Sequence, residues 1–173
     1  MTTSQLWNNA DGLLVRFNGE QGKRGNKLGL VKTEGVRREY RQSFTLTGAA
    51  RTIYSADLNN DGTLDGFTGL DSVIPAGCII TEARAVVKVA AAGGTSVAVN
   101  VYAADGTLLL ANGLITATQG ALANIDALTD APITGTGATL NTVLAANGYV
   151  SAVTVGTFTA GQIDVYYTVI DAR

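Results

Sequence analysis

Apolar and polar residues alternate with a two-residue period along Gly77–Tyr102. In its first half, Cys78–Val89, the odd positions are apolar or small, and the charged residues Glu82, Arg84 and Lys88 take even positions. In its second half, Thr95–Tyr102, every second residue is valine. This period is typical of strands with one buried and one solvated face. The glycine-ended turn between the halves predicts that they pair as a β-hairpin.

Shorter segments with strand character flank this stretch. The strands expected there are Leu28–Thr33, Arg38–Thr47, Arg51–Ala56, Leu108–Leu110, Thr139–Ala145, Tyr149–Val155 and Gln162–Val169. Turn-forming dipeptides such as Asp105-Gly106 and Asn147-Gly148 separate them, and Ala121–Leu128 fits a short helix. Roughly nine short strands joined by tight turns predict an all-β fold, a single jelly-roll-like β-sandwich.

The first 27 residues differ in composition from the rest. They are rich in Asn, Gly and charged residues and contain one short apolar run, Leu13–Phe17. So many turn-forming residues cannot bury a core of their own. We therefore expect residues 1–27 to form an extended basic N-terminal arm and residues 28–173 to form the β-sandwich domain. Trp7, the single tryptophan, is expected to anchor the arm in a pocket of this subunit or of a neighbour.

The composition removes most catalytic chemistry. The 173 residues include no histidine, so the usual general base at neutral pH and the commonest metal ligand are missing. Cys78 is the single cysteine, which rules out an internal disulfide or a cysteine zinc site. Next to Ile79 and Ile80 it is expected to be a small buried hydrophobe. The sequence therefore predicts no catalytic residues and no enzymatic activity.

Charge is distributed unevenly along the chain. Residues 1–51 carry nine Lys and Arg against four Asp and Glu, a balance of +5. Residues 52–173 carry three against ten, a balance of −7, which together give the net charge of −2. A basic arm on an acidic body indicates an acidic protein surface as partner, and a plainly solvated basic segment is the alternative. No basic helix or aromatic ladder supports nucleic acid as partner.

Targeting and membrane signals are missing from the sequence. The first residues are polar and lack the layout of a signal peptide. No apolar run approaches the roughly 20 residues that a membrane span needs. We expect a soluble protein that is made in a cytoplasm and has no membrane partner.

One segment has the spacing of a metal-binding loop. Asp57–Asp65 matches the start of a calcium loop, D-x-N-x-D-G-x-x-D. Side-chain oxygens would come from Asp57, Asn59, Asp61 and Asp65, and a backbone carbonyl from Thr63. Thr68 stands where such loops place a bidentate Glu, so we expect weak Ca²⁺ binding and no other cofactor. The alternative is a polar turn that binds no metal.

Several motifs together resemble a known family. They are Trp7–Phe17, Gly35–Tyr40, Ile74–Gly77, Val99–Thr107, Ala145–Val150 and Thr157–Gly161. Across nearly the whole chain they resemble segments of the small capsid decoration (cement) proteins of tailed bacteriophages. The resemblance implies a jelly-roll-like sandwich, usually trimeric, on the outer surface of the phage head, where it bridges major capsid subunits. It also implies a virion structural protein without catalytic residues, made in the host cytoplasm.

The arm is the expected attachment device. Its expected capsid contacts are Trp7, Leu13, Val15, Arg16, Phe17, Lys23 and Arg24. Apolar residues expected on outward faces, such as Val86 and Val150, would need cover from neighbouring subunits, which predicts a homotrimer. The alternative function is a host-receptor or carbohydrate-binding module of a phage head fibre or tail, in which Tyr102 and Tyr166 would face outward.

Overall fold

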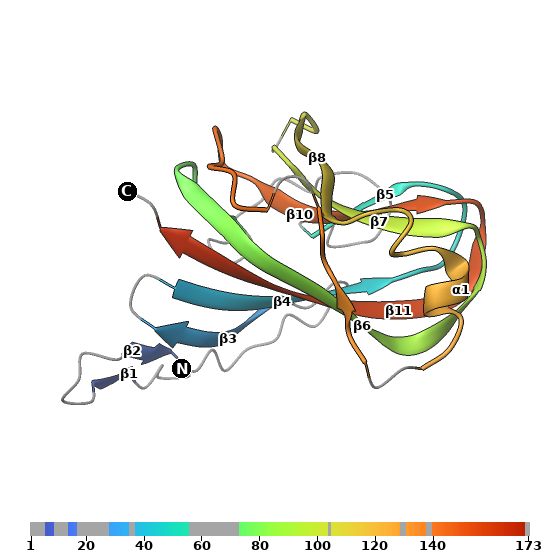
Figure 1. Ribbon diagram of the computed structural model, residues 1–173, viewed down its shortest axis with the longest axis horizontal. Coiled ribbons are helices and arrows are strands. Elements are labelled where there is room, and N and C mark those ends of the chain that lie inside the picture. The colour runs from blue at the N-terminus through green and yellow to red at the C-terminus, as the bar shows by residue number, and fades with distance from the viewer. Residues whose placement is uncertain are drawn as a thin grey trace, which may run out of the picture.

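Two antiparallel β-sheets packed face to face form the body of the protein in the computed structural model (Figure 1). The structure describes residues 37–55, 73–103, 105–128, 131–137 and 140–171, with side chains except at 110–112. Further towards the amino terminus it describes the backbone of three strands: β1 (Leu6–Asn8), β2 (Leu14–Arg16) and β3 (Leu28–Glu34).

The two sheets contain four and five strands. The first has the order β5 (Thr52–Tyr54), β10 (Tyr149–Val155), β7 (Ser96–Tyr102) and β8 (Leu108–Ile115). The second has the order β3, β4 (Arg37–Thr45), β11 (Phe158–Asp171), β6 (Cys78–Gly93) and β9 (Ile133–Thr134). A one-turn helix, α1 (Leu122–Ile125), lies in the connection between β8 and β9.

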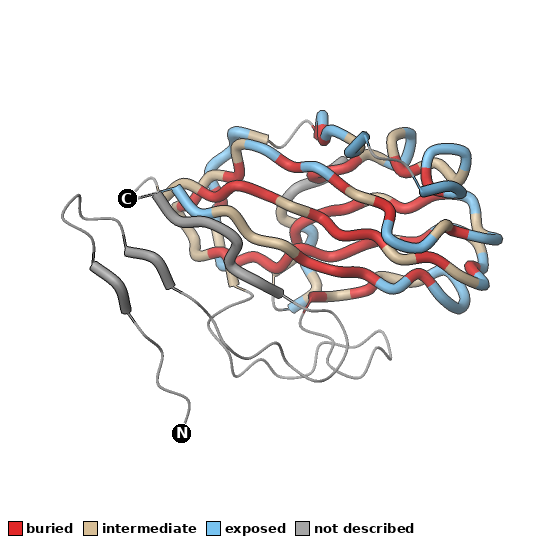
Figure 2. The backbone as a smooth tube through the Cα atoms, turned by 90° about the horizontal axis from the view of Figure 1, so that it is seen from below, coloured by how far each residue is buried: buried red, intermediate tan, exposed pale blue. Residues whose placement is uncertain are grey.

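Alternation along the strands builds the core. Phe44, Ile80 and Val165 of the five-stranded sheet are fully buried, as are Ile53 and Val99 of the four-stranded sheet. Buried residues run along the strands of both sheets (Figure 2). Cys78 is buried among them, as predicted. The prediction of an all-β sandwich is confirmed.

The strands from β4 to β11 pair in a nested order. The first pairs with the last, β4 with β11, and the next inward are β5 with β10, β6 with β9 and β7 with β8. Two further pairings, β11 with β6 and β10 with β7, join these pairs into the two sheets. Strands β4–β11 therefore have the connectivity of a single long hairpin whose strand pairs are divided between the two sheets.

The predicted hairpin over Gly77–Tyr102 is wrong. Its two strands exist, but β6 belongs to the five-stranded sheet and β7 to the four-stranded sheet. Gly93 and Gly94 have φ of 71° and 68°, and this left-handed turn carries the chain from one sheet to the other. An arch between sheets buries the same alternate residues as a hairpin, so the periodicity of the sequence fits both.

Three other predicted elements differ in the structure. Within Thr139–Ala145 the described residues form a turn with one bridge, from Val143 to Ile79, because Asn141 has a φ of 67° that interrupts an extended strand. The helix expected over Ala121–Leu128 shortens to α1. The strand expected at Leu108–Leu110 continues to Ile115 as β8.

One residue that the sequence analysis expected on an outward face lies in the core. Val150 is fully buried between the sheets, because β10 turns Val150 and Ala152 into the hydrophobic core. Val86, the other residue expected to need cover, is half-buried. Val150 therefore gives no support to a trimer.

Candidate functional site

Part of the amino-terminal arm forms a small sheet of its own. Strands β1 and β2 pair antiparallel, with Trp7 opposite Val15 and Leu6 opposite Arg16. This pairing was not expected, since three-residue strands in a segment rich in turn formers give little periodic signal. The remaining expected contact residues, Leu13, Phe17, Lys23 and Arg24, lie outside the described residues.

The expected calcium ligands also lie outside the described residues. These are Asp57, Asn59, Asp61, Thr63 and Asp65, all within the 56–72 segment. Among the residues that are described, no group of three or more Asp, Glu or Cys could hold a metal ion. The calcium site therefore stays a prediction from the sequence.

Calorimetric titration of the whole chain with Ca²⁺ tests this site. Binding with a dissociation constant of about 10⁻⁴ to 10⁻³ M is expected, because the loop lacks a bidentate ligand at its twelfth position. Asp61→Ala should abolish the heat of binding, and Asp105→Ala, an aspartate in a separate turn, should leave it unchanged. Absence of heat at millimolar Ca²⁺ would show that the segment is a polar turn.

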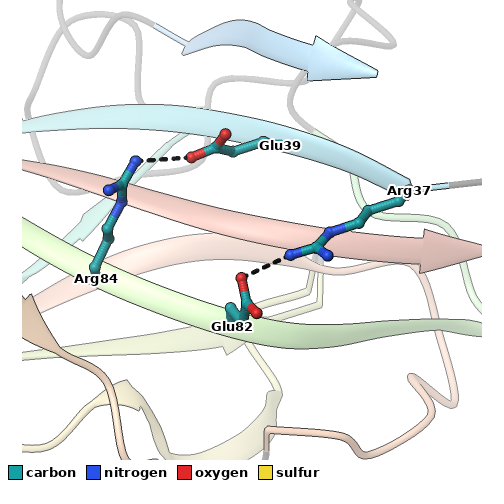
Figure 3. A network of polar contacts seen from close by, with 4 residues as sticks. All are labelled: Arg37, Glu39, Glu82 and Arg84. Carbon is teal, nitrogen blue, oxygen red and sulfur yellow. Dashed lines mark hydrogen bonds and ion pairs between the residues drawn. The ribbon is translucent and has the colours of Figure 1, made fainter. Parts of the chain in front are cut away.

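Charged side chains gather on the outer face of the five-stranded sheet (Figure 3). Arg37 Nη2 of β4 donates to Glu82 Oε2 of β6 at 2.8 Å, and Arg84 Nη2 of β6 donates to Glu39 Oε1 of β4 at 3.0 Å. Both ion pairs span β11, which lies between β4 and β6. The side chain of Glu39 is 25% exposed, and the other three are 49–67% exposed.

Strand register places these four residues together. Glu39 and Glu82 both lie opposite Thr168 of β11, and Arg84 lies opposite Tyr166. Adjacent strands in a sheet are about 4.8 Å apart, so β4 and β6, which have β11 between them, are separated by roughly twice that distance. Only long side chains can therefore reach from β4 to β6. The Arg84 guanidinium also lies over the Tyr166 ring, 4.8 Å from its centroid, in a cation–π contact.

These residues line a groove of about 540 Å³. Its floor is formed by β6 and β11, one side by Arg37 and Glu39 of β4, and the other by Pro132 and Thr134 around β9. Beneath it Tyr167 is buried and stacks on Tyr40 at 5.5 Å between ring centroids. Burial raises the pKa of the Tyr167 phenol, which therefore stays neutral.

A second polar cluster on the same face is buried. Ser43 Oγ donates to Asp164 Oδ1 at 2.5 Å, and Arg41 Nε lies 3.1 Å from Asp164 Oδ2 as an ion pair without hydrogen-bond geometry. The Asp164 side chain is fully buried, and Ser43 lies directly opposite it across β4 and β11. Since an uncompensated buried charge costs several kcal/mol, Arg41 and Ser43 compensate the charge of Asp164 in this strand pair.

The groove was missed by the sequence analysis. The sequence shows only that each residue is solvent-facing on its own strand. Glu39 on one strand, and Glu82 and Arg84 on another, occupy the polar positions of alternating segments. What joins them is their common pairing with β11, more than 80 residues further along the chain. Tyr166 does lie on this outer face, but Arg84 covers one face of its ring.

The chain matches no known family model, no curated protein and no solved structure. In the described part of the chain, no helix is long and apolar enough to span a membrane. The assignment of function therefore rests on the strand topology, the sequence motifs and the surface chemistry.

Proposed function

We propose that this chain is a non-enzymatic virion structural protein that decorates a tailed-phage head. It would stabilise the capsid by bridging major capsid subunits on the outer surface. The observation that carries the proposal is the nested pairing of β4 through β11. The resemblance of the sequence motifs to capsid decoration proteins gives the second line of support.

Nested pairing supports the finer assignment of the sandwich as a jelly roll. In a jelly roll, eight strands form two Greek keys distributed over two sheets, an architecture common in viral capsid and lectin domains. The eight strands β4–β11 fall into two sheets of four in this way, and β3 extends one of them. A fold alone does not define a function, so the capsid role also needs the arm and the motifs.

The arm and the body have complementary roles in this proposal. Residues 1–27 precede β3, so the arm leaves the sandwich at an edge strand of the five-stranded sheet. From there its basic residues would contact the major capsid protein. A homotrimer remains part of the proposal on the strength of the family resemblance, since Val150 is buried within its own subunit.

Virions purified from the phage that encodes this chain test the proposal. The 17.8 kDa chain should be present among the virion proteins, and cryo-electron microscopy should show density on the outside of the head, in clusters of three. Deleting the gene should remove that density and leave the head lattice intact. Density confined to the tail or to a fibre would instead favour a receptor-binding module, and a virion without the chain would refute both roles.

A further inference from the structure

The groove on the outer face of the five-stranded sheet offers hydrogen-bond donors and acceptors in balance. Arg37 and Arg84 bring two guanidinium groups, and Glu39 and Glu82 bring two carboxylates. Among the described residues, each ion pair uses one nitrogen and one oxygen. Since a guanidinium carries five N–H donors and a carboxylate about four acceptor positions, the described contacts leave most of this capacity for a ligand.

The charges of the groove select the class of ligand. With two positive and two negative groups lining it, a charged ligand is attracted by one pair and repelled by the other. A neutral ligand with neighbouring hydroxyl groups loses nothing in this way, because each hydroxyl donates to a carboxylate and accepts from a guanidinium. Thr134 and Thr168 also line the groove, and the side chain of each carries a hydroxyl group.

The surroundings of the groove disfavour other ligands. The floor strands β6 and β11 already pair with neighbours, so an extended peptide cannot add to the sheet there. Arg84 lies over the ring of Tyr166, which leaves that face closed to a nucleobase or another aromatic group. The volume of about 540 Å³ lies within the range of small-ligand pockets.

The four charged side chains are also held in place before a ligand arrives. All lie on paired strands, each takes part in one of the two diagonal ion pairs, and the Arg84 guanidinium rests on Tyr166. Such preorganisation lowers the entropy lost on binding. We propose that the groove binds a neutral oligosaccharide, whose hydroxyl groups donate to Glu39 and Glu82 and accept from Arg37 and Arg84. This binding does not require attachment to a capsid.

Calorimetric titration of the full chain with four neutral trisaccharides tests the proposal. The probes are maltotriose, mannotriose, galactotriose and N,N′,N″-triacetylchitotriose, with 3′-sialyllactose as the anionic comparison. At least one neutral probe should bind with a dissociation constant of about 1 mM or tighter, and more tightly than the anionic probe. Failure of all four to bind at about 10 mM, or a preference for sialyllactose, would overturn the proposal.

Substitutions then locate the site. Glu82→Gln and Arg84→Ala should each weaken binding at least roughly tenfold. Both side chains are half or more exposed, so the melting temperature should stay close to that of the parent chain. Lys88→Ala, on β6 but outside the groove, should leave the affinity unchanged. Binding that survives both groove substitutions would place the sugar elsewhere and refute this site.

Discussion

Replacing Gly94 with alanine should destabilise the sandwich by about 3 to 4 kcal/mol. Part of this cost, about 1 kcal/mol, comes from the left-handed φ of 68°, which an alanine adopts with strain. The larger part is steric, because a Cβ at this position would lie 2.3 Å from Cε2 of Phe158. Phe158 cannot move aside easily, since it is 1% exposed and exchanges two backbone hydrogen bonds with Gly48.

A matched glycine separates the two contributions. Gly106 also has a left-handed φ, of 82°, but a Cβ there would meet nothing closer than the Tyr54 hydroxyl oxygen at 3.7 Å. Gly106→Ala should therefore cost only about 1 kcal/mol. Urea unfolding followed by circular dichroism measures both variants on the same scale. Equal destabilisation of the two would mean that Phe158 does not pack against the turn between β6 and β7.

The failed hairpin prediction shows what the pattern of a sequence does and does not contain. Alternation located the central parts of β6, β7, β10 and β11, because each of these strands turns alternate apolar residues into a single core; the ends were missed, and β11 begins at Phe158 rather than Gln162. Alternation does not say which strand lies beside which. The turn at Gly93 and Gly94 packs against Phe158, 64 residues further on, and a local pattern does not contain such a contact.

The candidate site was predictable to a smaller extent than the fold. The solvent-facing sides of β4 and β6 could be predicted from the sequence, since Glu39 and Glu82 fall at polar positions of alternating segments. Their meeting depends on β11, which lies between β4 and β6 in space but follows both in sequence. β9, whose Thr134 lines the groove, has only two residues and is too short to show a period.

Removing residues 1–27 should abolish attachment to heads that lack this protein, while the sandwich remains folded. The deletion ends before β3 begins at Leu28, so every strand of the two sheets is retained. The arm holds Trp7 and Phe17, large apolar residues of the kind that dominate the affinity of interfaces once buried. Cosedimentation of the variant with heads from a gene-deletion phage measures the loss, and circular dichroism checks the fold.

Substitutions in the intact chain separate anchoring from steering. Trp7→Ala should weaken attachment by about 2 kcal/mol or more, close to thirtyfold in affinity, mainly through faster dissociation. Replacing Arg16, Lys23 and Arg24 together by glutamine should slow association and reduce its dependence on salt. Leu128→Ala is the matched control, because Leu128 is an apolar residue of the body that is 67% exposed. If the deletion variant saturated the heads at the same concentration as the full chain, the contacts with the capsid would belong to the sandwich and the arm would have another role.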